Sequence, residues 1–265
     1  MHVKLDDKIK NHVGFLIYSI KIYEQVKNMY KEKMQITSID VDENLELKLS
    51  SLFKFLQVAA SNHAEKINVG HLELLKHNML WVVIRMEVKI YRTPKLDDVI
   101  LVTTHPGETR SFIYPRYFEV YDSKGNLIIA ASSLWAIIDK STRRVVMKPK
   151  GLAPIKPETN KDDLSLPEKV IDDAQELVDV RKVRYTEIDL NGHLNNTQYI
   201  EYILDTHEPA FYKDHRISAI NITYEKEIKS GHEVKLYSDK GNPETIRGNV
   251  EGAPHFIAKL TYEHR

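Results

Sequence analysis

Hydrophobic and polar positions along the first half of the chain predict one helix followed by several long strands. From about Ser50 to Lys66 the apolar residues recur at helical spacing over a broad surface, which is typical of a helix buried on most sides. A strand over Met34–Val41 precedes this helix. The runs after it are apolar and β-branched, and we expect strands over Met79–Tyr91, Val99–His105, Phe112–Tyr121 and Leu127–Ile138.

The second half of the chain repeats this order of elements. A strand over Leu177–Tyr185 leads to a helix that begins near Asn195 or Asn196 and ends near Tyr212. The strands expected after it are Ile217–Ile228, Glu233–Ser238, Thr245–Val250 and His255–Tyr262. Two copies of strand, buried helix and antiparallel meander predict an α+β fold, most naturally a double hot-dog in which each sheet wraps round its helix. Two separate α+β domains of another kind are the alternative.

A proline-rich, charged segment over 148–176 separates the two copies and is typical of a linker, which we expect to be solvated. Apolar positions at helical spacing between Ile9 and Ile20 predict a further helix near the N-terminus, docked on the domain or on a second subunit, with a membrane-surface helix as the alternative. The predicted parts are an N-terminal helical extension over 1–30, an N-terminal hot-dog domain over 31–149, a linker over 150–176 and a C-terminal hot-dog domain over 177–265.

Composition narrows the function classes. The 265 residues include 38 basic and 38 acidic side chains, so no overall field attracts nucleic acid or an anionic membrane. The chain has no cysteine, which excludes disulfides, thiolate metal sites and a cysteine nucleophile. The apolar stretch at 13–20 is too short to span a bilayer and lacks a signal-peptide cleavage site. We therefore expect a cytoplasmic protein.

One short motif occurs in both halves with different polar residues. Residues 38–45 read S-I-D-V-D-E-N-L, and residues 187–194 read E-I-D-L-N-G-H-L. Aligned in this way, Asp42 corresponds to Asn191 and Asn44 corresponds to His193. A duplicated fold in which only one copy carries chemistry is expected to look like this.

The second copy of the motif has the residues needed for acyl transfer to water. Asp189, Asn191 and His193 alternate, so their side chains point the same way in an extended segment. Gly192 permits an unusual backbone conformation, and the helix start that follows offers free N–H groups to an oxyanion. Histidine titrates near neutral pH without assistance. A polar turn whose Asx side chains cap the backbone is the alternative interpretation.

The run Y-T-E-I-D-L-N-G-H-L-N-N-T-Q-Y-I at 185–200 resembles the acyl-acyl carrier protein thioesterases of plants and bacteria. In that family a D-x-N-x-H-x-N-N stretch opens the helix of the C-terminal hot-dog domain. The segment I-T-Y-E-K-E at 222–227 is similar to the tyrosine-basic-basic-glutamate segment of the family. In the N-terminal half the similarity continues through L-Q-V-A-A-S-N-H-A at 56–64, W-V-V-I-R at 81–85, R-Y-F-E-V-Y-D at 116–122 and S-S-L-W at 132–135.

This resemblance implies a catalytic set of Asp189, Asn191, His193 and Glu227. Ile228 stands where the plant enzymes have a cysteine, so a cysteine acyl-enzyme cannot operate. Two further departures concern carrier docking and substrate range: Glu225 replaces a basic residue, and His105-Pro106 replaces a tryptophan-proline pair.

The implied function is hydrolysis of fatty acyl-acyl carrier protein thioesters in fatty acid biosynthesis. Glu227 with His193 would activate water, or His193 would be the direct base with Glu227 as its orienter. Asn191 and a helix-start N–H would hold the carbonyl, and Asp189 would orient His193 or Asn191. An acyl-CoA thioesterase of the same fold, and a non-hydrolytic acyl-thioester binding protein or hydratase, are the alternatives.

By the same resemblance, the first copy would hold the acyl chain rather than react. Its candidate lining residues, for which ordinary core packing is the alternative, are Leu52, Leu56, Met79, Trp81, Val83 and Trp135. The partner would be acyl carrier protein, and homodimer formation is compatible with the fold. We expect no cofactor and no metal, because His71 with His77 and His207 with His215 lack the spacing and carboxylates of a zinc site.

Overall fold

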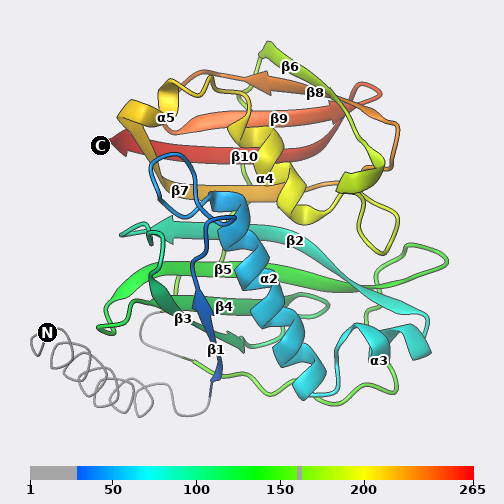
Figure 1. Ribbon diagram of the computed structural model, residues 1–265. Helices are drawn as coiled ribbons and strands as arrows, with labels where there is room; N and C mark the ends of the chain where they lie inside the picture. The colour runs from blue at the N-terminus through cyan, green and yellow to red at the C-terminus, as the bar shows by residue number, and fades with distance from the viewer. Residues whose placement is uncertain (1–28, 160–162) are drawn as a thin grey trace, which may run out of the picture.

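A single antiparallel sheet joins both halves of the molecule. The computed structural model describes residues 29–159 and 163–265, and its strands form a ten-stranded sheet in the order β1-β3-β4-β5-β2-β7-β10-β9-β8-β6 (Figure 1). The strands of the first half are β1 (Tyr30–Gln35), β2 (Met79–Ile90), β3 (Val99–Pro106), β4 (Tyr114–Tyr121) and β5 (Leu127–Asp139). Those of the second half are β6 (Glu176–Lys182), β7 (His215–Tyr224), β8 (Glu233–Ser238), β9 (Glu244–Val250) and β10 (Ala253–His264).

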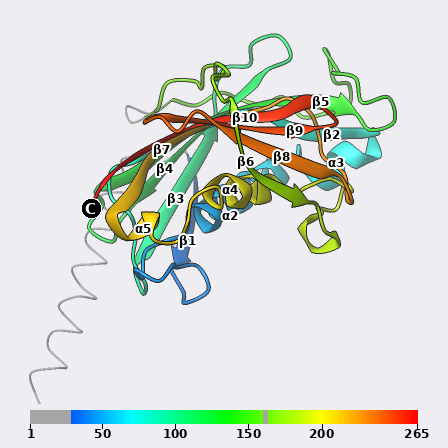
Figure 2. The same cartoon turned by 90° about the horizontal axis from the view of Figure 1, so that it is seen from above.

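Counted from the two edges of the sheet, the halves contribute their strands in equivalent order, β1-β3-β4-β5-β2 and β6-β8-β9-β10-β7. Each half begins with its outermost strand, and the halves meet where β2 pairs with β7, with Met86 opposite Ile222. The sheet arches over two helices, α2 (Leu49–Lys66) and α4 (Asn196–Leu204), which lie on the same face (Figure 2). This arrangement confirms the predicted double hot-dog fold.

One hydrophobic core lies between this sheet and its helices. Leu52 and Leu56 of α2, Ile200 of α4, and Val88 and Ile220 of the two central strands all belong to it, and each is at most 1% exposed. The apolar stripe of each helix thus packs on the inward-facing positions of the strands, which follow the period of two expected for a sheet with one buried face. The core is continuous across the junction between the halves.

The predicted and observed elements differ in several places. The first strand ends at Gln35 rather than Val41, because the chain then turns, with Asp40 accepting the N–H of Thr37. The second helix ends at Leu204 rather than Tyr212, and Pro209 precedes a separate short helix, α5 (Phe211–Asp214). A six-residue helix, α3 (His71–Lys76), was not predicted, because its length gives too few positions for helical periodicity to be visible. A short 3₁₀ helix, η1 (Tyr185–Glu187), follows β6.

The segment between the halves crosses the face of the sheet opposite α2 and α4 and is bound to it at several points, although most of its described residues are exposed, as expected for a solvated linker. Ser132 on β5 donates to the carbonyl of Ser165 at 2.6 Å, and Thr223 on β7 accepts the N–H of Val170 at 3.2 Å. Val170 is 5% exposed. Because the inward faces of these strands are apolar, their outward polar residues are free to bind this segment.

The predicted N-terminal helix, between Ile9 and Ile20, lies outside the described residues. Within the described ranges, none of the helices has the length and apolar character needed to cross a membrane.

The shared core generates a stability prediction. Ile222→Ala, at the β2–β7 junction, should lower the free energy of unfolding by about 2–5 kcal/mol, because Ile222 is fully buried. Urea unfolding followed by circular dichroism should still show one transition. Leu177→Ala, at a 49% exposed position, is the control and should change the value by less than about 0.5 kcal/mol. Two separate transitions in either variant would show that the halves fold independently.

Candidate active site

The carboxylate of Asp189 organises the turn that carries the predicted catalytic residues. Its Oδ1 accepts the N–H of Asn191 at 2.8 Å and the N–H of His193 at 3.2 Å. Its own N–H donates to the carbonyl of His193 at 2.8 Å, which closes the turn. Gly192 has φ of +82°, and no atom lies within 4 Å of the position that a Cβ would take. Asp189 therefore acts on His193 through the main chain.

The turn leads directly into α4 and is tied to the strand exit opposite. The side chain of Asn195 caps the helix by accepting the N–H of Thr197 at 2.9 Å, so that N–H is occupied rather than offered to an oxyanion. Leu194 donates its N–H to the carbonyl of Ile228 at 2.7 Å. This bond places Glu227, the residue before Ile228, beside the turn.

His193 and Glu227 face each other. Nε2 of His193 lies 3.5 Å from Oε2 of Glu227. The histidine side chain is 16% exposed and that of the glutamate 40% exposed, so the carboxylate is the more accessible of the two. Nδ1 of His193 is buried and has no hydrogen-bond partner among the described residues. The pair can bind one small polar molecule between them at the Nε2 side of the ring.

Arg143, which the sequence did not indicate, completes this site from the first half of the chain. Its guanidinium forms an ion pair with Oε1 of Glu227, the carboxylate oxygen that does not face His193. Arg143 lies in the turn after β5, and its N–H donates to the carbonyl of Asp139 at 2.9 Å. No spacing along the chain connects Arg143 to Glu227, because the contact is made only when the two halves pair.

Both halves line the cavity in front of this pair. It has a volume of about 420 Å³. The first half contributes His71 and Leu75 from α3, Leu80 from β2, and Lys140 and Arg143 from the turn after β5. The second half contributes Leu190, Asn191, His193, Glu227 and Lys229. The cationic side chains at this cavity suit an anionic or polar group near His193 and Glu227.

The first half contains the same turn with different chemistry. Oδ1 of Asp42 accepts the N–H of Asn44 at 2.9 Å and the N–H of Glu46 at 3.0 Å, as Asp189 does in the second half. Asp42 therefore corresponds to Asp189, and the alignment of Asp42 with Asn191 made from the sequence is wrong by two residues. Glu46 then occupies the position of His193.

The residue corresponding to Glu227 follows from the same geometry. Leu47 donates its N–H to the carbonyl of Pro94 at 2.8 Å, which matches the bond from Leu194 to Ile228. Thr93, the residue before Pro94, thus stands where Glu227 stands. The halves share the aspartate and asparagine of the turn and differ at the imidazole and the carboxylate.

A second cavity, of about 560 Å³, lies at the turn of the first half. Glu46 and Thr93 line it together with Tyr212 of α5 and Arg265, which follows β10. Arg265 forms an ion pair with Glu46 at 2.7 Å. In each half, an arginine of the opposite half therefore contacts an acidic residue at or beside the turn. Among the described residues that line this cavity, no histidine forms an ion pair with a carboxylate, because Glu46 takes the place of His193 and Thr93 takes the place of Glu227.

The six predicted acyl-lining residues do not gather in one place. Leu52 and Leu56 belong to the main core, and Leu52 also lines the larger cavity. Met79 and Trp81 belong to a smaller cluster beside α3, where the indole N–H of Trp81 donates to the carbonyl of Val69 at 2.8 Å. Val83 lies opposite Trp135 on the paired strands β2 and β5. None of the six lines the smaller cavity. Their role in binding an acyl chain stays a prediction.

Two family models match the chain in succession. Residues 27–153 match the acyl-ACP thioesterase N-terminal domain, and residues 171–253 match the acyl-ACP thioesterase C-terminal domain. Together these segments include both turns, Arg143 and Glu227.

Two plant proteins are similar to this chain over most of its length. Oleoyl-acyl carrier protein thioesterase 2 of Arabidopsis thaliana is 25% identical over 254 residues, covering 89% of this chain and 69% of that protein. Dodecanoyl-[acyl-carrier-protein] hydrolase of Cinnamomum camphora is 27% identical over 214 residues, covering 75% of this chain and 56% of that protein. The chain thus spans between about half and about two thirds of these relatives.

Solved structures share the fold. An acyl-ACP thioesterase from Bacteroides thetaiotaomicron superposes with a TM-score of 0.82 at 25% identity, covering 89% of this chain and 98% of that one. The 12:0-ACP thioesterase from Umbellularia californica superposes with a TM-score of 0.76 at 21% identity, with the same coverage of both chains.

The matching turns generate a paired prediction. Asp42→Ala and Asp189→Ala should each lower the free energy of unfolding by about 1–2 kcal/mol, because each removes the acceptor of two backbone N–H groups. Thermal or urea unfolding measures both. Equal losses would support the structural equivalence of the two turns, and a loss in only one variant would contradict it.

Proposed function

The chain belongs to the acyl-ACP thioesterase family, and we propose that it hydrolyses fatty acyl thioesters of acyl carrier protein. The products are a free fatty acid and the carrier with its free thiol. The observation that carries the proposal is the facing pair of His193 and Glu227 in a cavity built by both halves. A histidine and a carboxylate within reach of one water molecule can remove its proton as it attacks a thioester carbonyl.

We assign the role of direct base to Glu227. Its Oε2 faces the cavity and Nε2 of His193, while Oε1 is bound by Arg143. If Glu227 only oriented the ring through Nε2, His193 would have to accept the proton at Nδ1, which is buried. A water placed between Oε2 and Nε2 instead contacts both groups. Glu227 then accepts the proton, and His193 donates to or accepts from the same water through Nε2.

Asp189 and Asn191 support this pair. Asp189 holds the main chain of the turn in place and thereby positions His193. Asn191 lines the cavity, where its amide can donate a hydrogen bond to the thioester carbonyl and to the oxyanion that develops from it. The first half has the same aspartate and asparagine, so these two residues do not by themselves produce hydrolysis.

Arg143 positions Glu227. Its guanidinium donates to Oε1 of Glu227, and this charge-assisted contact restrains the carboxylate so that Oε2 stays turned towards His193. Because Arg143 comes from the first half, the catalytic site requires both halves to be folded and paired. We propose that the N-terminal hot-dog domain binds the acyl chain and that the C-terminal one carries the base. Arg143 departs from this division, because it belongs to the N-terminal domain and contacts the base.

The carrier protein would approach the mouth of the cavity that these residues line. Lys140, Arg143 and Lys229 lie there and can attract an acidic carrier or the phosphate of its pantetheine arm. Cytoplasmic location and homodimer formation stay predictions from the sequence, and sizing chromatography tests the second.

Substrate identity is tested by comparing matched thioesters. We expect faster release of free thiol from acyl-acyl carrier protein than from acyl-CoA with the same acyl chain, at equal concentrations. A reversed preference would identify an acyl-CoA thioesterase. Binding without thiol release would contradict hydrolysis and favour an acyl-binding protein or a hydratase. Chromatography of the fatty acids released by bacteria that express the protein would then show the preferred chain length.

The residue assignment has a matched control in the first half. His193→Ala and Glu227→Ala should each lower kcat by at least about 100-fold with the fold preserved, because each removes a proton-transfer group. Glu46→Ala and Thr93→Ala, at the corresponding positions of the first half, should leave kcat within about twofold of the wild type. Steady-state kinetics measures all four. Near-wild-type turnover in either of the first two variants would refute the assignment.

A further inference from the structure

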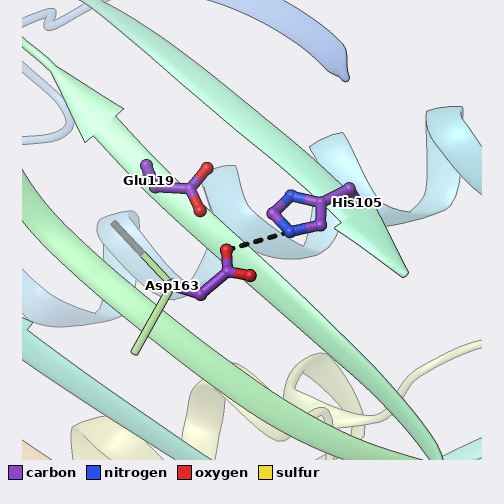
Figure 3. Close-up of side chains that lie close together, drawn as sticks. All are labelled: His105, Glu119 and Asp163. Atoms are coloured by element: carbon purple, nitrogen blue, oxygen red, sulfur yellow. Dashed lines mark ion pairs between the residues drawn. The ribbon is translucent and has the colours of Figure 1, made fainter. Parts of the chain in front are cut away.

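Three ionisable side chains from separate segments meet on the face of the sheet opposite the helices (Figure 3). His105 comes from β3, Glu119 from the adjacent strand β4, and Asp163 from the segment between the halves. Nε2 of His105 lies 2.9 Å from Oδ1 of Asp163. One potential ligand atom from each residue lies within 4.8 Å of the others.

This group is buried, which is unusual for three ionisable side chains. His105 and Glu119 are 0% exposed, and the side chain of Asp163 is 18% exposed. Nδ1 of His105 has no hydrogen-bond partner among the described residues, whereas the Glu119 carboxyl accepts from Thr103 and also interacts with the Asp163 carboxyl. Burial, together with the neighbouring Asp163 carboxyl, raises the pKa of Glu119 to about 7. Two carboxyl groups that lie together in a buried site repel one another when both are ionised, so a proton or a cation must be held between them.

The donor set suits a transition-metal ion. An imidazole nitrogen and two carboxylate oxygens are ligands that Zn²⁺ accepts at about 2.0–2.2 Å in tetrahedral geometry. Donors within 4.8 Å of one another can reach one such ion after small side-chain rotations. The charge of a divalent cation balances the two carboxylates, so the cluster becomes neutral when His105 is neutral.

A fourth ligand is available nearby. Glu158 lies in the same connecting segment, where its N–H donates to the carbonyl of Pro106 at 2.8 Å. Its Oε2 is buried and has no hydrogen-bond partner among the described residues. Glu158 also lies close enough to His105 for their charges to interact. Either this carboxylate or a water molecule can complete four-coordination.

We propose that His105, Glu119 and Asp163 form a structural binding site for a divalent transition-metal ion of the Zn²⁺ type. The ion joins two strands of the first half to the segment that leads to the second half. It therefore fixes the path of that segment across the sheet. None of the three residues lines the cavity that contains His193 and Glu227, so the ion acts on stability and takes no part in hydrolysis.

The site differs from the sequence prediction of no metal. That prediction used the spacing of histidines along the chain, whereas the three ligands here come from two paired strands and a distant loop. Strand pairing places Thr103 opposite Glu119 and His105 opposite Tyr117, which brings His105 and Glu119 to one face. Only the return of the connecting segment adds Asp163.

Zinc titration of metal-free protein tests the site. The full chain is dialysed against a chelator and then titrated with Zn²⁺ in a calorimeter, and the thermal midpoint is measured with and without the ion. We expect one Zn²⁺ per chain and a midpoint raised by on the order of 5 °C at saturating Zn²⁺. Mg²⁺ should give a much smaller shift, because it prefers all-oxygen sites. Binding should weaken from pH 7.5 to pH 5.5, because protons compete for the ligands.

Variants separate this site from adventitious binding. Asp163→Asn and Glu119→Gln should each weaken Zn²⁺ binding at least tenfold and remove most of the midpoint shift. Asp172→Asn is the matched control, because Asp172 lies in the same segment and pairs with Arg247 at 2.7 Å outside the cluster. It should bind Zn²⁺ like the wild type.

Two outcomes would overturn the proposal. Absence of Zn²⁺ binding by the wild type would mean that a proton-linked His105–Asp163 ion pair and a neutral Glu119 hold the segment without metal. Equal Zn²⁺ binding by the wild type and by Asp163→Asn and Glu119→Gln would place the ion at other histidines. Hydrolysis by the metal-free protein is measured in parallel at a temperature well below its midpoint and is expected to be unchanged. A failure of the metal site is thereby distinguished from a failure of the proposed hydrolysis.

Discussion

The antiparallel pairing of β2 with β7 is the contact on which the rest of the structure depends. It turns two five-stranded halves into one sheet with a continuous core, with Met86 opposite Ile222 at the junction. It also sets the end of the last strand of each half beside the turn of the other. Arg143 therefore reaches Glu227, and Arg265 reaches Glu46. Without this pairing, neither cavity would have the lining residues that the opposite half contributes.

The two halves of the molecule share the main-chain structure of the turn and differ in side chains that the turn and the strand exit present. Both turns use an aspartate to bind two backbone N–H groups, and both tie the start of a helix to a strand exit. Among the side chains that the two turns present, Glu46 stands in place of His193 and Thr93 in place of Glu227. The same framework thus presents His193 and Glu227 in one half and Glu46 and Thr93 in the other, because the turn is stabilised by main-chain bonds that do not involve these side chains.

The face of the sheet opposite the helices has an equally specific organisation. Polar side chains on β3, β5 and β7 bind the connecting segment. Such a buried polar layer is stable when its groups find partners, as Ser132 does at the carbonyl of Ser165 and Thr223 does at the N–H of Val170. The cluster of His105, Glu119 and Asp163 is the part of this layer where an imidazole and two carboxyl groups lie together.

The sequence by itself determined the class of fold, most strand and helix positions, and the residues of the second turn. These depend on local periodicity and on a motif within a few residues, both of which are visible along the chain. It placed Glu227 through family resemblance. It misaligned the two turns by two residues, because the alignment matched the two I-D pairs by residue type, and the hydrogen bonds that Asp42 accepts cannot be seen in the sequence. Tertiary structure alone decided that Arg143 meets Glu227, that α3 lines the cavity of His193 and Glu227, and that the connecting segment is bound to the sheet. Each of these contacts joins residues far apart in sequence, and only strand pairing and packing bring such residues together.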